Sequence, residues 1–200
     1  MQVRELSIAG AWEITPKLNS DSRGTFFEWV TDRGFTGFAG HRLDVRQANC
    51  STSAAGVLRG LHFAQVPPSQ AKYVTCVSGS VFDVVVDIRL GSPTFGQWDS
   101  VLLDDRDHRT IYISEGLAHG FLALQDNSTV MYLCSAEYNP QREHTIAPTD
   151  PTLAIDWPGG HELLLSDRDA AAATLDEVRA AGLLPTWEET QAFVQGLRGA

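Results

Sequence analysis

The chain has 200 residues, of which 15 are Lys or Arg and 25 are Asp or Glu, so its formal net charge is −10. This acidic balance disfavours partners that are themselves negatively charged, and we expect no binding to nucleic acid or to an anionic membrane. Cys50, Cys76 and Cys134 are too few and too widely spaced for a disulfide framework or a paired-cysteine zinc site, and they favour a cytoplasmic protein. The sequence shows no N-terminal apolar block and no run of about 20 apolar residues, so we expect neither secretion nor membrane insertion.

Residues 1–41 predict an additional strand pair and a loop ahead of the main body. The stretch DSRGTFFEWV at 21–30 belongs to this part of the chain. Gly34, Gly37 and Gly40 follow it, and repeated glycines weaken the prediction of any regular element between them.

Residues 42–147 predict the core of an all-β fold. Short runs, each of strand length and bounded by Gly, Pro, Asp, Asn or Ser, are typical of a sandwich or barrel. The runs are DVRQANCS, GVLRGLHF, KYVTCVSG, SVFDVVVDIR, WDSVLLD, RTIYIS, HGFLALQ and TVMYLCSAEY. Alternation within 81–88 puts Asp83 and Asp87 on one face and four apolar side chains on the other, and we expect the apolar face to be the core.

Residues 148–200 differ in kind from the rest and predict two short helices packed on the barrel. Alanine-rich residues end at Gly182, which is a typical helix stop, and Thr186 with Glu189 three residues later forms a capping box. Together the three segments predict a single domain spanning residues 1–200.

Four side chains on the predicted strands are candidates for acid, base or charge-stabilising chemistry next to a carbonyl. His62 follows Gly60, which permits a ligand or a neighbouring backbone to come close, although a lone strand histidine is more often a hydrogen-bonded core residue. Lys72 needs a partner or a ligand if it points inward, and it is merely solvated if it points outward. Tyr132 and His119 are equally consistent with the core.

A metal centre is disfavoured by the spacing of the candidate ligands. A second histidine two residues beyond His62 would place both on one strand face, but that position is Ala64, and no carboxylate follows at close range. The sequence also contains no glycine-rich phosphate loop.

Several long motifs occur in one order along the chain and resemble those of the dTDP-4-dehydrorhamnose 3,5-epimerases, from about residue 1 to 190. The motifs are RGLHF at 59–63, KYVTCVSGSVFDVVVDIRLGSPTFGQW at 72–98, EGLAHGF at 115–121, MYLCSAEYNP at 131–140 and LLSDRDA at 164–170. The resemblance implies a cupin-like jelly-roll β-barrel, a homodimer with exchanged N-terminal strands, a dTDP-sugar substrate, and neither a metal nor another cofactor.

The resemblance also implies residue roles. His62 matches the family's catalytic base and Asp169 its carboxylate partner, while Tyr132 matches the acid on the opposite face of the sugar and Lys72 the cation beside the C4 oxygen. The implied substrate-binding positions are Arg23, Phe26, Glu28, Gln47, Asn49, Arg59, His119, Tyr138, Glu143 and Arg168.

The expected reaction is epimerisation of dTDP-4-dehydro-6-deoxy-D-glucose to dTDP-4-dehydro-L-rhamnose. The C4 ketone acidifies the protons on C3 and C5, so a single base can serve both carbons without a redox cofactor. Three alternatives stay open: an epimerase that inverts only C3 or only C5, a non-catalytic cupin that binds nucleotide sugars, and a metal-dependent cupin dioxygenase.

Overall fold

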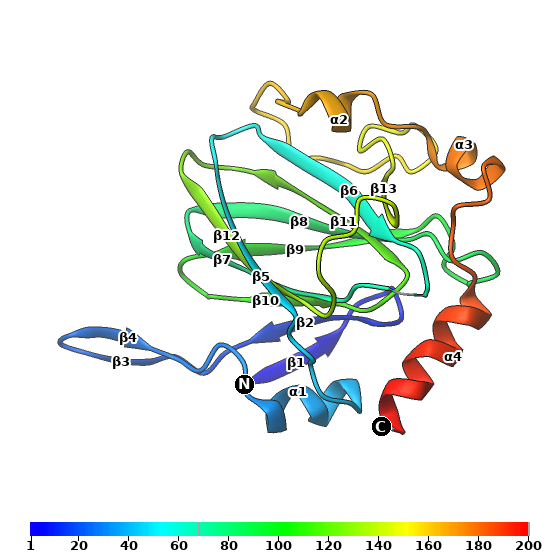
Figure 1. The fold of residues 1–200 in the computed structure, drawn as a ribbon. Coiled ribbons are helices and arrows are strands. Elements are labelled where there is room, and N and C mark those ends of the chain that lie inside the picture. The colour runs from blue at the N-terminus through cyan, green and yellow to red at the C-terminus, as the bar shows by residue number, and fades with distance from the viewer. Residues whose placement is uncertain (68, 200) are drawn as a thin grey trace.

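The computed structural model describes residues 1–67 and 69–199, and its framework is two antiparallel β-sheets that face each other (Figure 1). In spatial order, the six-stranded sheet consists of β1 (Gln2–Glu5), β2 (Ala11–Thr15), β10 (Thr110–Ile113), β7 (Lys72–Ser78), β12 (Ser128–Cys134) and β5 (Gln47–Ser53). The five-stranded sheet consists of β13 (Glu143–Thr145), β6 (Leu58–Ala64), β11 (Leu117–Ala123), β8 (Ser80–Asp87) and β9 (Trp98–Asp104). The predicted all-β jelly roll is confirmed, because every regular element described between residues 42 and 147 is a strand.

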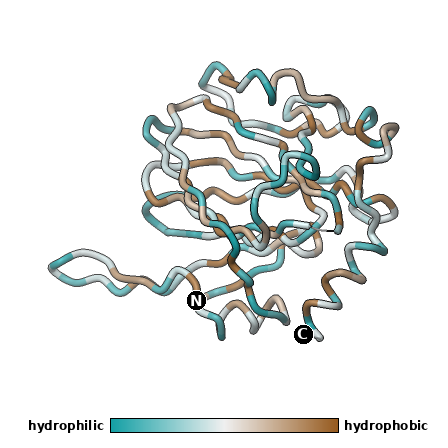
Figure 2. The backbone as a smooth tube through the Cα atoms, viewed as in Figure 1, coloured by the Kyte–Doolittle hydropathy of each residue, from teal (hydrophilic) through white to brown (hydrophobic). Residues whose placement is uncertain are grey.

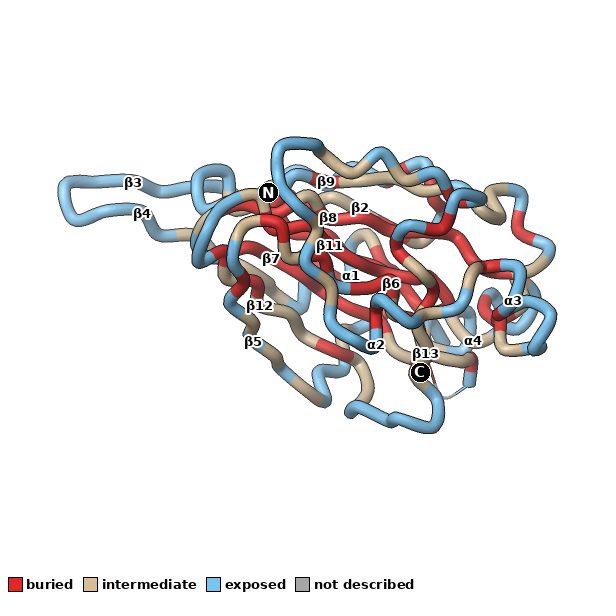
Figure 3. The backbone as a smooth tube through the Cα atoms, turned by 90° about the horizontal axis from the view of Figure 1, so that it is seen from above, coloured by how far each residue is buried: buried red, intermediate tan, exposed pale blue. Residues whose placement is uncertain are grey.

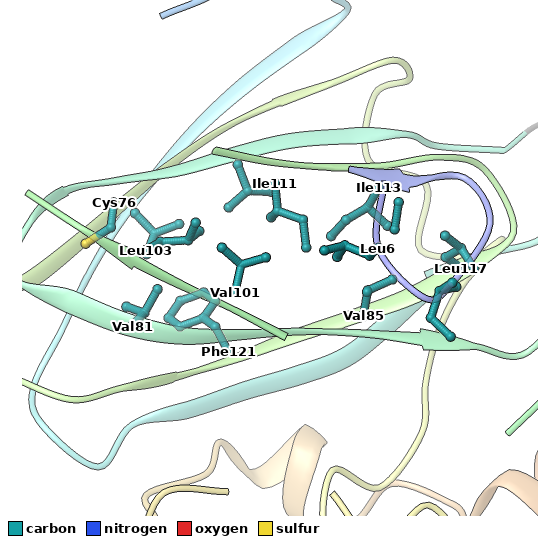
Figure 4. Close-up of a cluster of buried hydrophobic side chains, with 14 of the residues drawn as sticks. Leu6, Cys76, Val81, Val85, Val101, Leu103, Ile111, Ile113, Leu117 and Phe121 are labelled. Carbon is teal, nitrogen blue, oxygen red and sulfur yellow. The ribbon is translucent and has the colours of Figure 1, made fainter. Parts of the chain in front are cut away.

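The main core fills the space between the two sheets. Figure 4 shows Val101 of β9 and Phe121 of β11 facing Ile111 of β10, so side chains of the two sheets meet in one cluster. Buried positions concentrate along the strands in Figure 3, as expected for a sandwich whose inner faces interdigitate.

The prediction for β8 is half correct. Its apolar face is buried, but it packs outside the sandwich against residues of the C-terminal segment such as Leu153 and Val178. The face that carries Asp83 and Asp87 is the one that points between the sheets, and both carboxylates are fully buried. Because the C-terminal segment covers the outer side of this sheet, both faces are buried, and alternation alone does not identify the inner one.

The N-terminal region holds a strand pair, as predicted, and also a helix that was not predicted. β3 (Asn19–Asp21) and β4 (Gly24–Phe26) form an exposed hairpin that projects beyond the sheets (Figures 1 and 3). Helix α1 (Asp32–Ala39) begins after Thr31, whose hydroxyl accepts from the Gly34 amide, and ends at Gly40 in the left-handed conformation. Gly40 therefore acts as a helix terminator, while burial of apolar side chains against the six-stranded sheet outweighs the glycines within the helix.

The described part of the C-terminal segment contains three helices, one more than predicted: α2 (Asp167–Ala170), α3 (Leu175–Ala180) and α4 (Trp187–Arg198). The additional helix is α2, a single turn whose first amides are capped by Ser166. The capping box at Thr186 and Glu189 is confirmed. Hydrophobic and hydrophilic residues alternate along α4 in Figure 2, which is the pattern of a helix with one face on the protein. Arg89, buried in an ion pair with Asp87, places its guanidinium 4.6 Å from the ring centre of Trp187 and so ties α4 to the sandwich. None of the described helices is long and apolar enough to cross a membrane.

Candidate active site

A cavity of about 140 Å³ opens between the two sheets and collects five of the predicted site residues. Its lining comes from β5, β6, β7, β11 and β12, so both sheets contribute. The lining residues are Ser51, Arg59, His62, Lys72, His119, Phe121 and Tyr132. Residues that are up to 81 positions apart in the sequence are thus brought to one site by the pairing of the strands.

Glycine allows two strands to approach closely behind this cavity. A side chain at Gly60 would place its Cβ 2.6 Å from the Gly120 Cα, and the φ of Gly60 is +120°, which other residues rarely adopt. The ladder between β6 and β11 pairs His62 with His119 and shifts register just beyond that pair. The predicted close approach at Gly60 is therefore one between backbones, and it sets the two histidines side by side.

His62 and Asp169 form a hydrogen-bonded dyad. His62 Nε2 lies 2.8 Å from Asp169 Oδ1, and the Asp169 side chain is only 5% exposed. Asp169 lies on α2, which begins where the Ser166 hydroxyl accepts from the Asp169 amide. Because an ionised carboxylate only accepts, Nε2 carries the proton of the neutral ring, and Nδ1 is the nitrogen with a free lone pair.

The electrostatics of the dyad favour a neutral imidazole next to an ionised carboxylate. Burial lowers the pKa of His62, with Lys72 and Arg168 acting in the same direction and Asp169 opposing them. Burial alone would raise the pKa of Asp169, but the hydrogen bonds that it receives from His62 and Gly60 hold it below its ordinary value. His62 is therefore ready to accept a proton, and Asp169 is placed to stabilise the imidazolium that results.

Lys72 points inward from β7 and is 9% exposed. Burial lowers its pKa, while Cys134, Glu143 and Asp83 act in the opposite direction. Over residues 1–67 and 69–199, no carboxylate lies within ion-pair distance of its ammonium group. An inward cation of this kind is suited to stabilise negative charge on a bound ligand.

Tyr132 belongs to the six-stranded sheet, whereas His62 belongs to the five-stranded sheet. Both line the same cavity, so a ligand held between the sheets has one on either side. Burial, reinforced by Cys134, raises the pKa of Tyr132 and keeps its phenol protonated at neutral pH. The arrangement therefore has an imidazole that can accept a proton on one wall and a phenol that can donate one on the other.

The sequence reasoning did not identify Asp83 as part of the site. Both of its carboxylate oxygens lie 2.9 Å from His119 Nε2, which makes a second histidine–carboxylate pair beside the first. Burial raises the pKa of Asp83, and His119 and Lys72 oppose this effect. The signal in the sequence that could have identified Asp83 was a carboxylate within an otherwise apolar strand.

The described part of the chain holds no group of three or more His, Cys, Asp and Glu side chains arranged for a metal ion.

Ser51 was also missed. Its buried hydroxyl has no hydrogen-bond partner among the described residues, and the residue lines the cavity. Ser51 lies two positions after Asn49 on β5, so Gln47, Asn49 and Ser51 share one face of the strand. This alternation is the signal in the sequence that could have identified Ser51 as a site residue.

Four of the predicted binding residues lie in a connected network. The Tyr138 amide donates to Gln47 Oε1 at 2.8 Å, and Gln47 Nε2 donates to Asn49 Oδ1 at 2.8 Å. Glu143 accepts from the Asn139 amide at 3.1 Å, next to Tyr138. The Tyr138 side chain is 53% exposed, which leaves its ring free to lie against a flat ligand group.

Two arginines supply positive charge in an otherwise acidic protein. Arg59 Nε donates to Ser53 at 3.1 Å, which leaves its two terminal nitrogens for a ligand. Arg168 Nε donates to Thr145 at 3.0 Å and lies directly before Asp169. Planar guanidinium groups suit the bidentate recognition of phosphate.

The three predicted binding residues of the N-terminal hairpin region are not at this cavity within the single described chain. The Arg23 side chain is 87% exposed and pairs with Asp21 of the same hairpin, and Phe26 is 68% exposed. Glu28 lines a separate surface hollow with Lys17. Because the hairpin projects away from the sheets (Figure 1), none of the three contributes to the site of its own chain.

Comparisons with known proteins give one consistent family. The family model described as dTDP-4-dehydrorhamnose 3,5-epimerase matches residues 5–177. Over the full length of both chains, the sequence is 77% identical to a dTDP-4-dehydrorhamnose 3,5-epimerase of Mycobacterium tuberculosis. A solved epimerase structure from Mycobacterium tuberculosis is similar with 76% identity and a TM-score of 0.98, covering 98% of this chain and 100% of that one. A 3'-monoepimerase of Streptomyces bikiniensis, solved in complex with dTDP-quinovose, is similar with 47% identity and a TM-score of 0.95, covering 98% of both chains.

Proposed function

The chain belongs to the dTDP-4-dehydrorhamnose 3,5-epimerase family, and we propose that it is an isomerase that converts dTDP-4-dehydro-6-deoxy-D-glucose to dTDP-4-dehydro-L-rhamnose. The observation that carries this proposal is that His62 and Tyr132 line one cavity from facing sheets, and that buried Lys72 lines the same cavity. Epimerisation needs a proton removed from one face of a carbon and another delivered to the opposite face. This site has both groups.

The first step is proton abstraction from a carbon next to the C4 ketone. His62 Nδ1 takes the proton, and Asp169 stabilises the imidazolium through its hydrogen bond to Nε2. The electron pair of the broken C–H bond moves into the enolate, whose oxygen is stabilised by Lys72, with His119 lining the same cavity.

The second step inverts the centre. Tyr132 donates its phenolic proton to the same carbon from the opposite side, and the enolate returns to the ketone. His62 then loses a proton to solvent and Tyr132 regains one, so the cycle is balanced without a redox cofactor. Because C3 and C5 both flank the ketone, a small shift of the sugar presents the second carbon to the same pair.

The network of Gln47, Tyr138 and Glu143 and the nearby cations Arg59 and Arg168 are suited to hold the nucleotide and its diphosphate. The solved Streptomyces bikiniensis relative is described as a complex with dTDP-quinovose, which supports a dTDP-sugar as the ligand class here. All three cysteines are free thiols, in keeping with the cytoplasmic location that we propose.

We propose further that the active form is a homodimer in which each hairpin reaches the partner's cavity. The projecting hairpin and the exposed ring of Phe26 support this, because Arg23 and Phe26 have no role at the cavity of their own chain. Mixing a His62→Ala chain with an Arg23→Ala chain then restores one complete site per hybrid dimer. The matched control mixes an Arg23→Ala chain with a His62→Ala/Arg23→Ala chain. It should restore no activity, because neither chain supplies an intact Arg23. Equal activity in both mixtures would contradict the exchange.

One experiment separates the double epimerase from an enzyme that inverts a single carbon, an alternative that the similarity to a 3'-monoepimerase keeps open. The nucleotide sugar is incubated with the enzyme in deuterated water, and the label is located in the product. Deuterium at both C3 and C5 with both centres inverted supports the proposed reaction. Label at one carbon supports the single-centre enzyme, and binding without label or turnover indicates a non-catalytic nucleotide-sugar protein.

A further inference from the structure

A second cavity, here called the α4 cavity, lies on the far side of the six-stranded sheet. Its volume is about 200 Å³, and it shares no lining residue with the catalytic cavity among those described. Tyr112 of β10 and Ala71, which directly precedes β7, line it and pack in one hydrophobic cluster with Phe35 of α1. Lys72 lines the catalytic cavity and so points the other way. Phe193 and Leu197 of α4 form part of its wall.

Unpaired polar atoms are concentrated at this cavity. The described residues contain five buried side-chain oxygen or nitrogen atoms without a hydrogen-bond partner, and three belong to residues that line the α4 cavity. They are Ser69 Oγ, Tyr112 Oη and Glu115 Oε2, on residues that are 3%, 0% and 1% exposed. Buried polar atoms are normally satisfied, so three at one place indicate that a bound molecule supplies the missing partners.

The number and type of these atoms specify the chemistry of the molecule. Two hydroxyls and one carboxylate present three acceptors, and a primary ammonium group carries three N–H donors and one positive charge. The remaining walls include Leu43, Phe193 and Leu197, which suit a short apolar chain. Since a cavity of roughly 150 Å³ holds benzene, this one has room for about the same number of heavy atoms.

We propose that the α4 cavity is a binding site for a primary ammonium ligand with a short apolar chain, the ammonium contacting Ser69, Tyr112 and Glu115 and the chain lying against Phe193 and Leu197.

The other charged groups around the cavity are engaged elsewhere. Arg42 pairs with Asp32 at 3.0 Å, and Asp44 pairs with Arg46 at 2.6 Å. Arg198 donates from Nε to a backbone carbonyl of α1 at 3.2 Å. Glu115 is therefore the charged group left to pair with a cation inside the cavity.

Glu115 also links binding to pH. Burial raises the pKa of Glu115 to about 7. His41 lines the same cavity, and its Nδ1 donates to the backbone carbonyl of Arg42. An alkylammonium stays charged to about pH 10, so its binding ionises the carboxyl and releases a proton when the solution is below pH 7. Affinity should accordingly fall as the pH is lowered from 8 to 6.

The test is a chemical-shift titration of the full-length protein with n-butylammonium, followed at the amides of residues 193–197 and repeated with n-butanol and butyrate. We expect saturation with a Kd on the order of 1 mM at pH 8 and a Kd about tenfold weaker at pH 6, which follows the fall in the ionised fraction of Glu115. Glu115→Gln should weaken binding at least tenfold at pH 8. The control is Glu188→Gln, which removes an exposed carboxylate of α4 and should leave the Kd unchanged.

Several results would overturn the proposal. One is n-butanol binding as tightly as n-butylammonium, and another is an unchanged Kd in Glu115→Gln with its fold verified by an unaltered spectrum. A crystal soaked in n-butylammonium that shows only water in the cavity would also refute it, as would a side chain from a second copy filling the cavity in the solution dimer. Ser69→Ala and Tyr112→Phe give an independent check, since each removes one acceptor and should weaken binding without unfolding the protein.

Discussion

Replacing Asp169 by Asn tests the proposed dyad most directly. The carboxylate lies 2.8 Å from His62 Nε2 and is 5% exposed, so water screens the interaction little. A hydrogen bond to a charged partner contributes about 1.5–3 kcal/mol. If that stabilisation is needed when the imidazolium forms, its loss lowers kcat/KM by about 10- to 150-fold. The new amide adds to the loss whenever it donates to Nε2, because the ring proton then moves to Nδ1 and blocks the base.

The same substitution should change the pH profile in a defined direction. Asp169 opposes the effects of burial and of Lys72, which lower the pKa of His62. Without the carboxylate the pKa of His62 falls further. The base is active when it is deprotonated, so the acid limb of kcat/KM moves to lower pH while the plateau drops.

The assay is kcat/KM for dTDP-4-dehydro-6-deoxy-D-glucose measured from pH 5 to 9. Asp167→Asn is the matched control, because it removes an exposed carboxylate from the same short helix and should leave rate and profile unchanged. An Asp169→Asn rate within twofold of the parent, or an acid limb that does not move, would refute the dyad.

Four further outcomes are expected. Tyr132→Phe should keep deuterium wash-in while the inverted product falls by orders of magnitude; normal inversion would remove Tyr132 as the acid. His62→Ala should abolish wash-in at C3 and C5, a loss of about 10²–10⁴-fold, with dTDP binding retained by calorimetry. The pKa of Glu115 rises from 4.5 unfolded to about 7 folded, so stability is lost as pH increases through that window. The free energy of unfolding of Glu115→Gln, measured by urea denaturation, should therefore rise relative to that of the parent by up to about 3 kcal/mol between pH 4 and 8. A difference that does not change with pH would contradict this. Gly60→Ala should lower the urea midpoint strongly, because the new Cβ would lie 2.6 Å from the Gly120 Cα.

Local patterns in the sequence determined the class of the fold and the kind of chemistry. Strand-length runs between turn residues were sufficient to predict the eight strands β5 to β12, although the three-residue β13 was not among them, and the capping box at Thr186 located the start of α4. Both signals act over a few residues, through side-chain alternation and the satisfaction of helix-terminal amides. The family motifs named a base, an acid and a cation, and the pairing of strands brings His62, Lys72 and Tyr132 to one cavity.

Only the tertiary structure decided which strand faces are buried and which residues that are distant in the sequence come into contact. Which face of β8 points inward follows from the C-terminal segment lying over the outer side, so alternation was not informative. Asp83 became part of the site only when β8 and β11 paired. The α1 helix forms because its apolar side chains are buried against the sheet, which outweighs its glycines. Among the described strands, β3 and β4 pair only with each other, so the hairpin with Arg23 is not held at its own cavity. In each case the free energy comes from burial or pairing between distant segments, and local residue patterns do not contain it.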